Sequence, residues 1–147
     1  MSYLKIWIHL VFSTKNRVPY LEKELRSKLF DHIKKNAIEK GIFIKSINGY
    51  VDHVHILLSL NSEHSISKIA QLIKGESSFW INKNNLTKQK FEWQDEYFAV
   101  SVSESGIDQV IQYILNQEEH HSEKTFQDEY NEFLKKYNFE IFVNSKA

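Results

Sequence analysis

At 147 residues, of which 41% are hydrophobic and 14% aromatic, the chain has the length of one domain and is too apolar for a disordered protein. Cysteine is absent, which excludes disulfides and thiolate metal sites. No signal peptide or transmembrane segment is evident either, so we expect a cytoplasmic protein outside the membrane. The formal net charge of zero argues against a nucleic-acid partner, but the charge is unevenly distributed.

The two parts of the chain have opposite charge. Residues 1–90 contain 15 Lys and Arg against 7 Asp and Glu, whereas residues 91–147 contain 4 against 12. A basic part of this kind can mark a surface that binds a polyanion, with an acidic counterpart elsewhere in the chain. Attraction between the two parts inside the fold explains the pattern equally well, so charge alone leaves both interpretations open.

Four segments have the pattern of β-strands. Apolar residues alternate along residues 4–13, which predicts a strand with one face on the core. Residues 42–50 and 53–60 follow one another closely with Gly49 between their apolar parts, as in a β-hairpin. Residues 97–104 form the fourth predicted strand.

Four further segments have helical periodicity: residues 21–40, 65–83, 105–121 and 125–139. The second and third of them each begin with a serine, which can cap the N-terminus of a helix. The segment between residues 82 and 96 is the longest predicted loop.

The predicted order of elements is β-α-β-β-α-β-α. The first six elements are those of the ferredoxin-like, split βαβ arrangement, an α+β fold with an antiparallel sheet and helices on one face. We expect one domain over residues 1–147, with residues 125–147 as a C-terminal helix or tail.

Two histidines interrupt the third predicted strand. Because side chains at i and i+2 of a strand point the same way, His53 and His55 lie side by side on one face. Their ring nitrogens can converge on one divalent ion, and Asp52 can orient an imidazole. The alternative is that this face is solvated, or that each histidine has its own hydrogen-bond partner.

The predicted helix at 105–121 carries a polar flank beside its apolar stripe. Tyr113, Gln117 and His120 follow one another on that flank at i, i+4 and i+7. A tyrosine beside a metal site is a candidate nucleophile, and a glutamine oxygen is a ligand that suits Mg²⁺ or Mn²⁺. A tyrosine at such a boundary is also commonly a packing residue.

These segments resemble one known family. The stretch "DHVHILLSL" is similar to the His-hydrophobic-His (HUH) motif, and "YILNQ" to the Tyr-x-x-x-Gln helix, of the single-tyrosine transposases of the insertion sequence 200-like family. Relatives include the transposases associated with repetitive extragenic palindromes (REP). The stretches "HLVFSTKNRVPYL", "ISKIAQLIKGESSFWIN" and "NQEEHHSEKTFQDEY" resemble further blocks, so the likeness covers nearly the whole chain. Asn16 stands where the family often has an aromatic residue.

The resemblance implies an enzyme that cuts and rejoins single-stranded DNA at hairpins, without ATP. Tyr113 would attack a phosphodiester and form a 5′-phosphotyrosine, while His53, His55 and Gln117 would hold Mg²⁺ or Mn²⁺. His120 is a candidate for proton transfer on the basis of its place on the helix flank alone.

The resemblance also implies a DNA-binding surface and a partner subunit. We expect phosphate and base contacts from six residues, each of which could instead be a solvated or core side chain: Lys15, Arg17, Lys74, Ser77, Ser78 and Trp80. Many relatives pair two subunits, so a homodimer is expected. Two alternative functions remain at this stage: a catalytically silent protein that binds DNA hairpins, and a ferredoxin-like domain that senses or stores metal.

Overall fold

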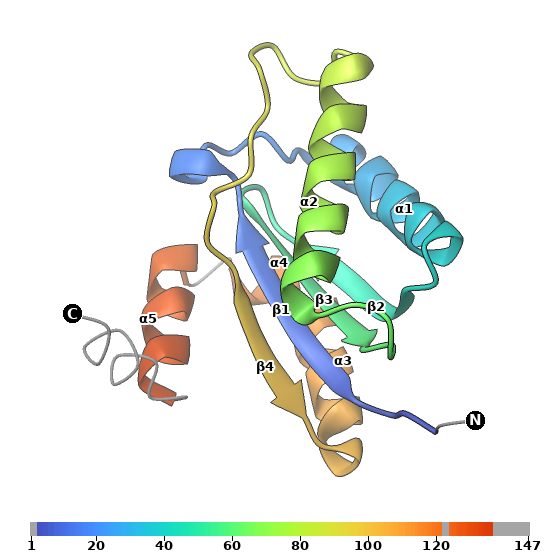
Figure 1. Cartoon of the computed structure of the whole chain (residues 1–147). Coiled ribbons are helices and arrows are strands. Elements are labelled where there is room, and N and C mark those ends of the chain that lie inside the picture. The colour runs from blue at the N-terminus through green and yellow to red at the C-terminus, as the bar shows by residue number, and fades with distance from the viewer. Residues whose placement is uncertain (1–2, 122–123, 137–147) are drawn as a thin grey trace, which may run out of the picture. The chain divides into compact units, whose positions relative to one another are not determined.

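The structure is a computed structural model, which describes residues 3–121 and 124–136 (Figure 1). The chain divides into two compact units, Met1–Gln117 and Glu118–Ala147. The division falls before residue 125, where the sequence predicts the start of a C-terminal tail. That the whole chain acts as one domain stays a prediction.

The first unit is built on a four-stranded antiparallel sheet. Its strands are β1 (Trp7–Ser13), β2 (Phe43–Gly49), β3 (His53–Ser59) and β4 (Phe98–Val102). They lie in the order β2-β3-β1-β4, with every neighbouring pair antiparallel. This is the strand order of the split βαβ arrangement, and it confirms the predicted fold class.

Helices α1 (Lys23–Glu39) and α2 (Ile66–Lys83) cover one face of the sheet, and α2 crosses in front of β1 in Figure 1. Ser65 caps α2 as predicted, since its hydroxyl accepts a hydrogen bond from the Lys68 backbone N–H at 3.1 Å. The core on this face holds the inward side chains of both central strands: Leu10, Phe12, Val54, Ile56 and Leu58.

Helix α3 (Ile107–Leu115) packs on the opposite face of the sheet, behind the strands in Figure 1. Its buried residues Ile107 and Ile114 cluster with Trp7 and Leu57, which the central strands present on that side. The prediction of helices on one face is therefore correct for α1 and α2, and α3 is the exception. The physical reason is that alternation along β1 and β3 leaves a second apolar patch, which the stripe of α3 covers.

Several shorter elements complete the described chain. A one-turn helix, η1 (Lys15–Arg17), follows β1, and another, η2 (Glu104–Gly106), precedes α3. The predicted helix over 105–121 is interrupted at Asn116, and α4 (Gln117–His120) follows the interruption.

The second unit contains α5 (Phe126–Lys136), where the sequence predicts its last helix. Thr125 caps α5, because its hydroxyl accepts from the Asp128 N–H at 3.2 Å and the Asp128 carboxylate faces the Thr125 N–H at 3.4 Å. Among the helices of the described residues, none is long and apolar enough to cross a lipid bilayer.

The β2–β3 hairpin requires a residue without a side chain at Gly49. A Cβ atom there would collide with the backbone carbonyl of His53 and would lie 3.1 Å from Val54 Cα. We therefore expect Gly49→Ala to lower the free energy of unfolding by about 1–3 kcal/mol, since the backbone of β3 must move. Gly75, in α2, has open space around its Cα, so Gly75→Ala should stabilise the protein by about 0.5–1 kcal/mol. Thermal denaturation of both variants measures the two changes in stability. Equal changes in the two variants would contradict the special requirement for glycine at position 49.

Candidate active site

Strand β3 places His53 and His55 on the face of the sheet that also receives α3. Both side chains are fully buried, at 0% exposure. Their ring centroids are 5.1 Å apart with an interplanar angle of 77°, and a ring nitrogen of each lies within 4.8 Å of one of the other. The predicted juxtaposition of the two imidazoles is present.

His53 has a partner at each ring nitrogen. Its Nδ1 lies 2.8 Å from Asp52 Oδ1, and its Nε2 lies 3.0 Å from Gln117 Oε1. The amide of Gln117 is oriented by a second contact, because its Nε2 donates to the backbone carbonyl of Tyr113 at 3.1 Å. That donation turns the carbonyl oxygen of Gln117 toward His53.

The position of the His53 protons decides how these two contacts are made. The Asp52 carboxylate and the Gln117 oxygen can only accept, so if the single proton of a neutral ring is on Nδ1, Nε2 and the Gln117 oxygen face each other as two acceptors. Such a pair is favourable when a proton or a cation lies between the two atoms. Neighbouring ligands of an octahedral ion with bonds of about 2.1 Å are about 3.0 Å apart. An imidazole nitrogen and an amide oxygen at this separation have the spacing of neighbouring ligands of a divalent cation.

Tyr113 lies beside the histidines within one chain. Its ring centroid is 5.6 Å from that of His55 at 79°, and 6.2 Å from that of His9 at 74°. The side chain is partly exposed, so a substrate can approach the phenol. The structure thus brings Tyr113, Gln117 and both histidines together, as the sequence predicts.

A contact from β2 fixes the end of α3. Asn48 donates through Nδ2 to the backbone carbonyls of Ile114 and Leu115, at 3.0 and 3.1 Å. These carbonyls belong to the last turn of α3, where helical partners are missing. Asn116 ends the helix with its N–H on the Gln112 carbonyl, and Gln117 still reaches His53. The side chain of His120 lies outside the described part of the structure.

Sequence analysis did not select His9, which belongs to the same cluster. Its Nε2 lies 2.9 Å from Nδ1 of His55, and its side chain is 5% exposed. The strand pattern places His9 on the same face as Trp7, but a pattern does not reveal which residue of another strand lies opposite. The register supplies this, since β1 pairs Val11 with His55 and His9 with Leu57.

The turn that follows β1 and carries Lys15 and Arg17, here called the basic turn, lies at the end of the sheet where β3 begins. The Thr14 N–H donates to the backbone carbonyl of Asp52 at 2.8 Å, which ties the turn to the residue before His53. Asn16 and Arg17 have positive φ angles of 58° and 55°, and asparagine adopts this conformation more readily than most residues. Both Lys15 and Arg17 are exposed. Lys15 also pairs with Glu92 at 3.2 Å, and this hydrogen bond lowers the pKa of the Glu92 carboxyl.

A groove of about 670 Å³ runs between α2 and residues 90–97, on the face of the sheet opposite the histidines. Three predicted DNA-binding residues, Lys15, Lys74 and Ser78, line it. The ammonium of Lys74 already donates to the backbone carbonyls of residues 94–96 at 2.5 to 3.5 Å, and burial lowers the pKa of this group.

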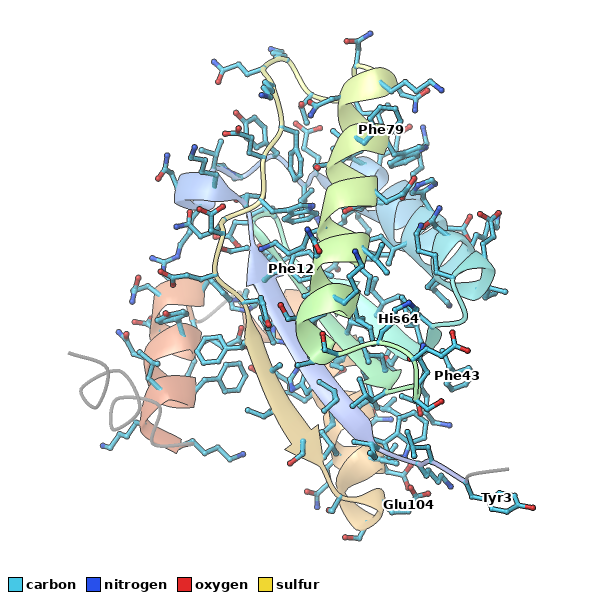
Figure 2. The ribbon with its side chains drawn as sticks, in the orientation of Figure 1. Tyr3, Phe12, Phe43, His64, Phe79 and Glu104 are labelled. Carbon is cyan, nitrogen blue, oxygen red and sulfur yellow. The ribbon has the colours of Figure 1, made fainter. Side chains whose placement is uncertain are left out.

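Two predicted DNA contacts have other roles in the structure. Ser77 is fully buried; its hydroxyl donates to the Ile73 carbonyl at 2.7 Å and accepts from Trp93 Nε1 at 3.0 Å. The ring of Trp80 stacks on His32, 4.2 Å away at 10°. Phe79, which the sequence analysis passed over, is 63% exposed on α2 (Figure 2).

Comparisons with known proteins find a family and relatives that match most of the chain. The family model described as "Transposase IS200 like" matches residues 2–117, nearly the whole first unit. The ISDra2 transposase TnpA of Deinococcus radiodurans is 27% identical over 114 residues, which span 74% of this chain and 81% of that protein.

Two solved structures share the fold. A crystal structure of a protein from Deinococcus radiodurans R1, described as a transposase, is 29% identical with a TM-score of 0.64, covering 79% of this chain and 93% of that one. A REP-associated tyrosine transposase bound to a REP hairpin is 17% identical with a TM-score of 0.62, covering 82% of this chain and 72% of that one. At this lower identity the second likeness concerns the fold alone.

The contact between Asn48 and the end of α3 generates a prediction about local stability. We expect Asn48→Ala to weaken the docking of α3 by about 0.5–1.5 kcal/mol, because two helix carbonyls lose a donor. Hydrogen exchange measured by mass spectrometry should rise in residues 107–116 and stay unchanged in α2. Asn84→Ala is the control, since Asn84 donates at 2.9 Å to Trp80 of its own helix. Unchanged protection of α3 in Asn48→Ala would contradict the role of Asn48.

Proposed function

Because the chain belongs to the family of IS200-like transposases, we propose that it cuts and rejoins single-stranded DNA at hairpin ends through a 5′-phosphotyrosine on Tyr113. The observation that carries the proposal is the meeting of Tyr113 with His53, His55 and Gln117 in one cluster. A partly exposed phenol beside two buried imidazoles puts a candidate nucleophile next to side chains that can bind a cation.

The proposed step is a transesterification. The Tyr113 oxygen forms a bond to phosphorus, and the bond between phosphorus and the 3′ oxygen breaks. The phenol loses its proton, and the released 3′ oxygen takes up a proton to become a 3′ hydroxyl. A phosphodiester is replaced by another, so the step needs no ATP, and a 3′ hydroxyl can reverse it. His120 remains a candidate for moving the proton, as proposed from its place in the sequence.

The residues proposed to hold Mg²⁺ or Mn²⁺ are His53, His55 and Gln117. In support, His53 Nε2 and Gln117 Oε1 lie 3.0 Å apart, while Asp52 and the Tyr113 carbonyl hold the two side chains in place. A bound ion would neutralise charge on the phosphate during attack. The protein's own groups orient these ligands before any ion binds, which lowers the cost of assembling the site.

The proposed DNA path passes the basic turn. Lys15 and Arg17 are exposed at the end of the sheet where β3 begins, so they can contact phosphates of a strand that enters the cluster. Ser78 and the exposed ring of Phe79 lie on α2, where an aromatic face can stack on an unpaired base. Lys74 would act by holding residues 94–96 in place. A relative that binds a REP hairpin shares this fold, which supports a hairpin as the substrate.

A homodimer is part of the proposal. The sheet of the described residues is open, with β2 and β4 at its edges. An open edge can pair with a second copy of the same chain.

The two alternatives are less well supported. A silent hairpin-binding protein would not require Tyr113 to lie beside His55, and it would bind a hairpin without forming a covalent product. A metal-storage domain would not require the basic turn next to Asp52, and it would bind metal without affinity for DNA.

The nucleophile can be tested with a labelled hairpin oligonucleotide and Mn²⁺. We expect the wild-type chain to form a covalent adduct that survives denaturing electrophoresis, and Tyr113→Phe to form none while still binding the hairpin. Tyr50→Phe is the matched control, because Tyr50 is another half-buried tyrosine and should leave the adduct unchanged. An adduct that persists in Tyr113→Phe would exclude this tyrosine, and a wild-type chain that binds without an adduct would favour the silent protein.

The basic turn can be tested through the salt dependence of DNA binding. If Arg17 contacts a phosphate, Arg17→Gln should weaken hairpin binding and reduce the slope of log K against log salt by about 1. Lys28→Gln on α1 is the control, because Lys28 is exposed and pairs only loosely with Glu24, at 3.4 Å. Equal slopes for wild type and Arg17→Gln, measured by fluorescence anisotropy, would remove Arg17 from the DNA path.

A further inference from the structure

The buried contact between His9 and His55 joins the candidate metal site to a second strand. His9 Nε2 and His55 Nδ1 are 2.9 Å apart, with ring centroids at 5.1 Å and an interplanar angle of 34°. His9 comes from β1 and His55 from β3, and the antiparallel register makes them diagonal neighbours on one face. The contact is therefore built into the sheet and does not depend on a loop.

When both rings are neutral, one proton lies between these nitrogens, and its position decides what His55 can do. If the proton is on His9 Nε2, His55 accepts through Nδ1 and carries its own proton on Nε2, which then has no lone pair for a cation. If the proton is on His55 Nδ1, His55 donates to His9, and its Nε2 keeps the lone pair. The second arrangement is the one that allows His55 to bind a metal ion.

We propose that His9 is a positioning residue that accepts the Nδ1 proton of His55 and so holds His55 in the tautomer that binds a metal ion through Nε2. The inference rests on the proposed function, because it concerns a metal ligand of that site. It assigns to His9 the task for His55 that Asp52 performs for His53, whose Nδ1 lies 2.8 Å from the carboxylate. Each histidine of the pair would then have its own acceptor for the Nδ1 proton: Asp52, just before β3, for His53, and His9, on β1, for His55.

The two acceptors differ in chemistry. The carboxylate of Asp52 only accepts hydrogen bonds, so it fixes one tautomer of His53. An imidazole can donate or accept, so the His9–His55 pair has two arrangements. We expect the one with the proton on His55 Nδ1 to predominate before any cation binds, and cation binding by His55 to favour it further. His9 also lies 6.2 Å from the ring of Tyr113, which means that the residue orienting His55 packs against the proposed nucleophile as well.

The first test is the tautomer of His55 in the metal-free wild-type protein. With ¹⁵N-labelled histidine, the ring nitrogen shifts distinguish a protonated from an unprotonated nitrogen. We expect His55 to be protonated at Nδ1 and His9 at its own Nδ1. A His55 protonated at Nε2 would overturn the inference, whatever the protein does with DNA or metal.

The second test measures Mn²⁺ binding by calorimetry in the absence of DNA. His9→Phe keeps a ring of similar size and removes the acceptor, so we expect the Kd for Mn²⁺ to rise about 10- to 100-fold and His55 to lose its single tautomer. His9→Gln restores an oxygen acceptor near the position of Nε2 and should recover most of the affinity. His64→Phe is the control, because His64 contacts Asn61 at 3.2 Å in the loop before α2 (Figure 2) and is not one of the residues of the cluster.

The outcomes separate the inference from the proposed function. A His9→Phe protein that folds and binds Mn²⁺ as tightly as the wild type would overturn the role of His9 and leave the metal site in place. A wild-type protein that binds no Mn²⁺ would instead contradict the metal site itself. If His9→Phe does not fold, the tautomer in the wild type and the affinity of His9→Gln decide the question.

Discussion

The register between β1 and β3 is the constraint on which the rest of the structure depends. It pairs Ser13 with His53 and Val11 with His55, so the two histidines face away from α1 and α2. Because side chains alternate along a strand, a shift of one residue would turn both imidazoles into the core under those helices and expose Val54 in their place. The apolar side chains of that core therefore stabilise the register, and through it the position of the histidines and of His9.

The two faces of the sheet differ in composition and in what they hold in place. One face carries the apolar core and lies under α1 and α2. The other is divided: its apolar end holds Trp7 and Leu57 and anchors α3, whereas its polar end holds the histidines. Because α3 packs on the apolar end, its residue Tyr113 lies beside the histidines of the polar end. Contacts with neighbouring groups orient His53, His55 and Gln117, so these side chains are held in place in advance of any substrate.

The opposite charges of the two parts of the chain are partly explained by contacts inside the fold. Lys15 pairs with Glu92, and Glu104 pairs with Lys5 at 2.8 Å and accepts from the Trp7 indole N–H. These contacts lower the pKa of both carboxyl groups. Ion pairs between residues 1–90 and residues 91–147 are thus present, in line with the interpretation that the two parts of the chain attract each other. Arg17 on the same turn remains exposed, so the interpretation as a DNA surface is not displaced by the pairing.

The sequence by itself determined the four strands, α1, α2 and the shared face of His53 and His55, because periodicity and capping are local, whereas the roles expected for the site residues came from the resemblance to a family. Only the tertiary structure decided which segments meet. It placed α3 behind the sheet, broke the predicted helix at Asn116 and brought His9 to His55. It also buried Ser77, which the family resemblance had suggested as a DNA contact. These features depend on strand register and on packing between distant segments, for which a pattern in one segment holds no information.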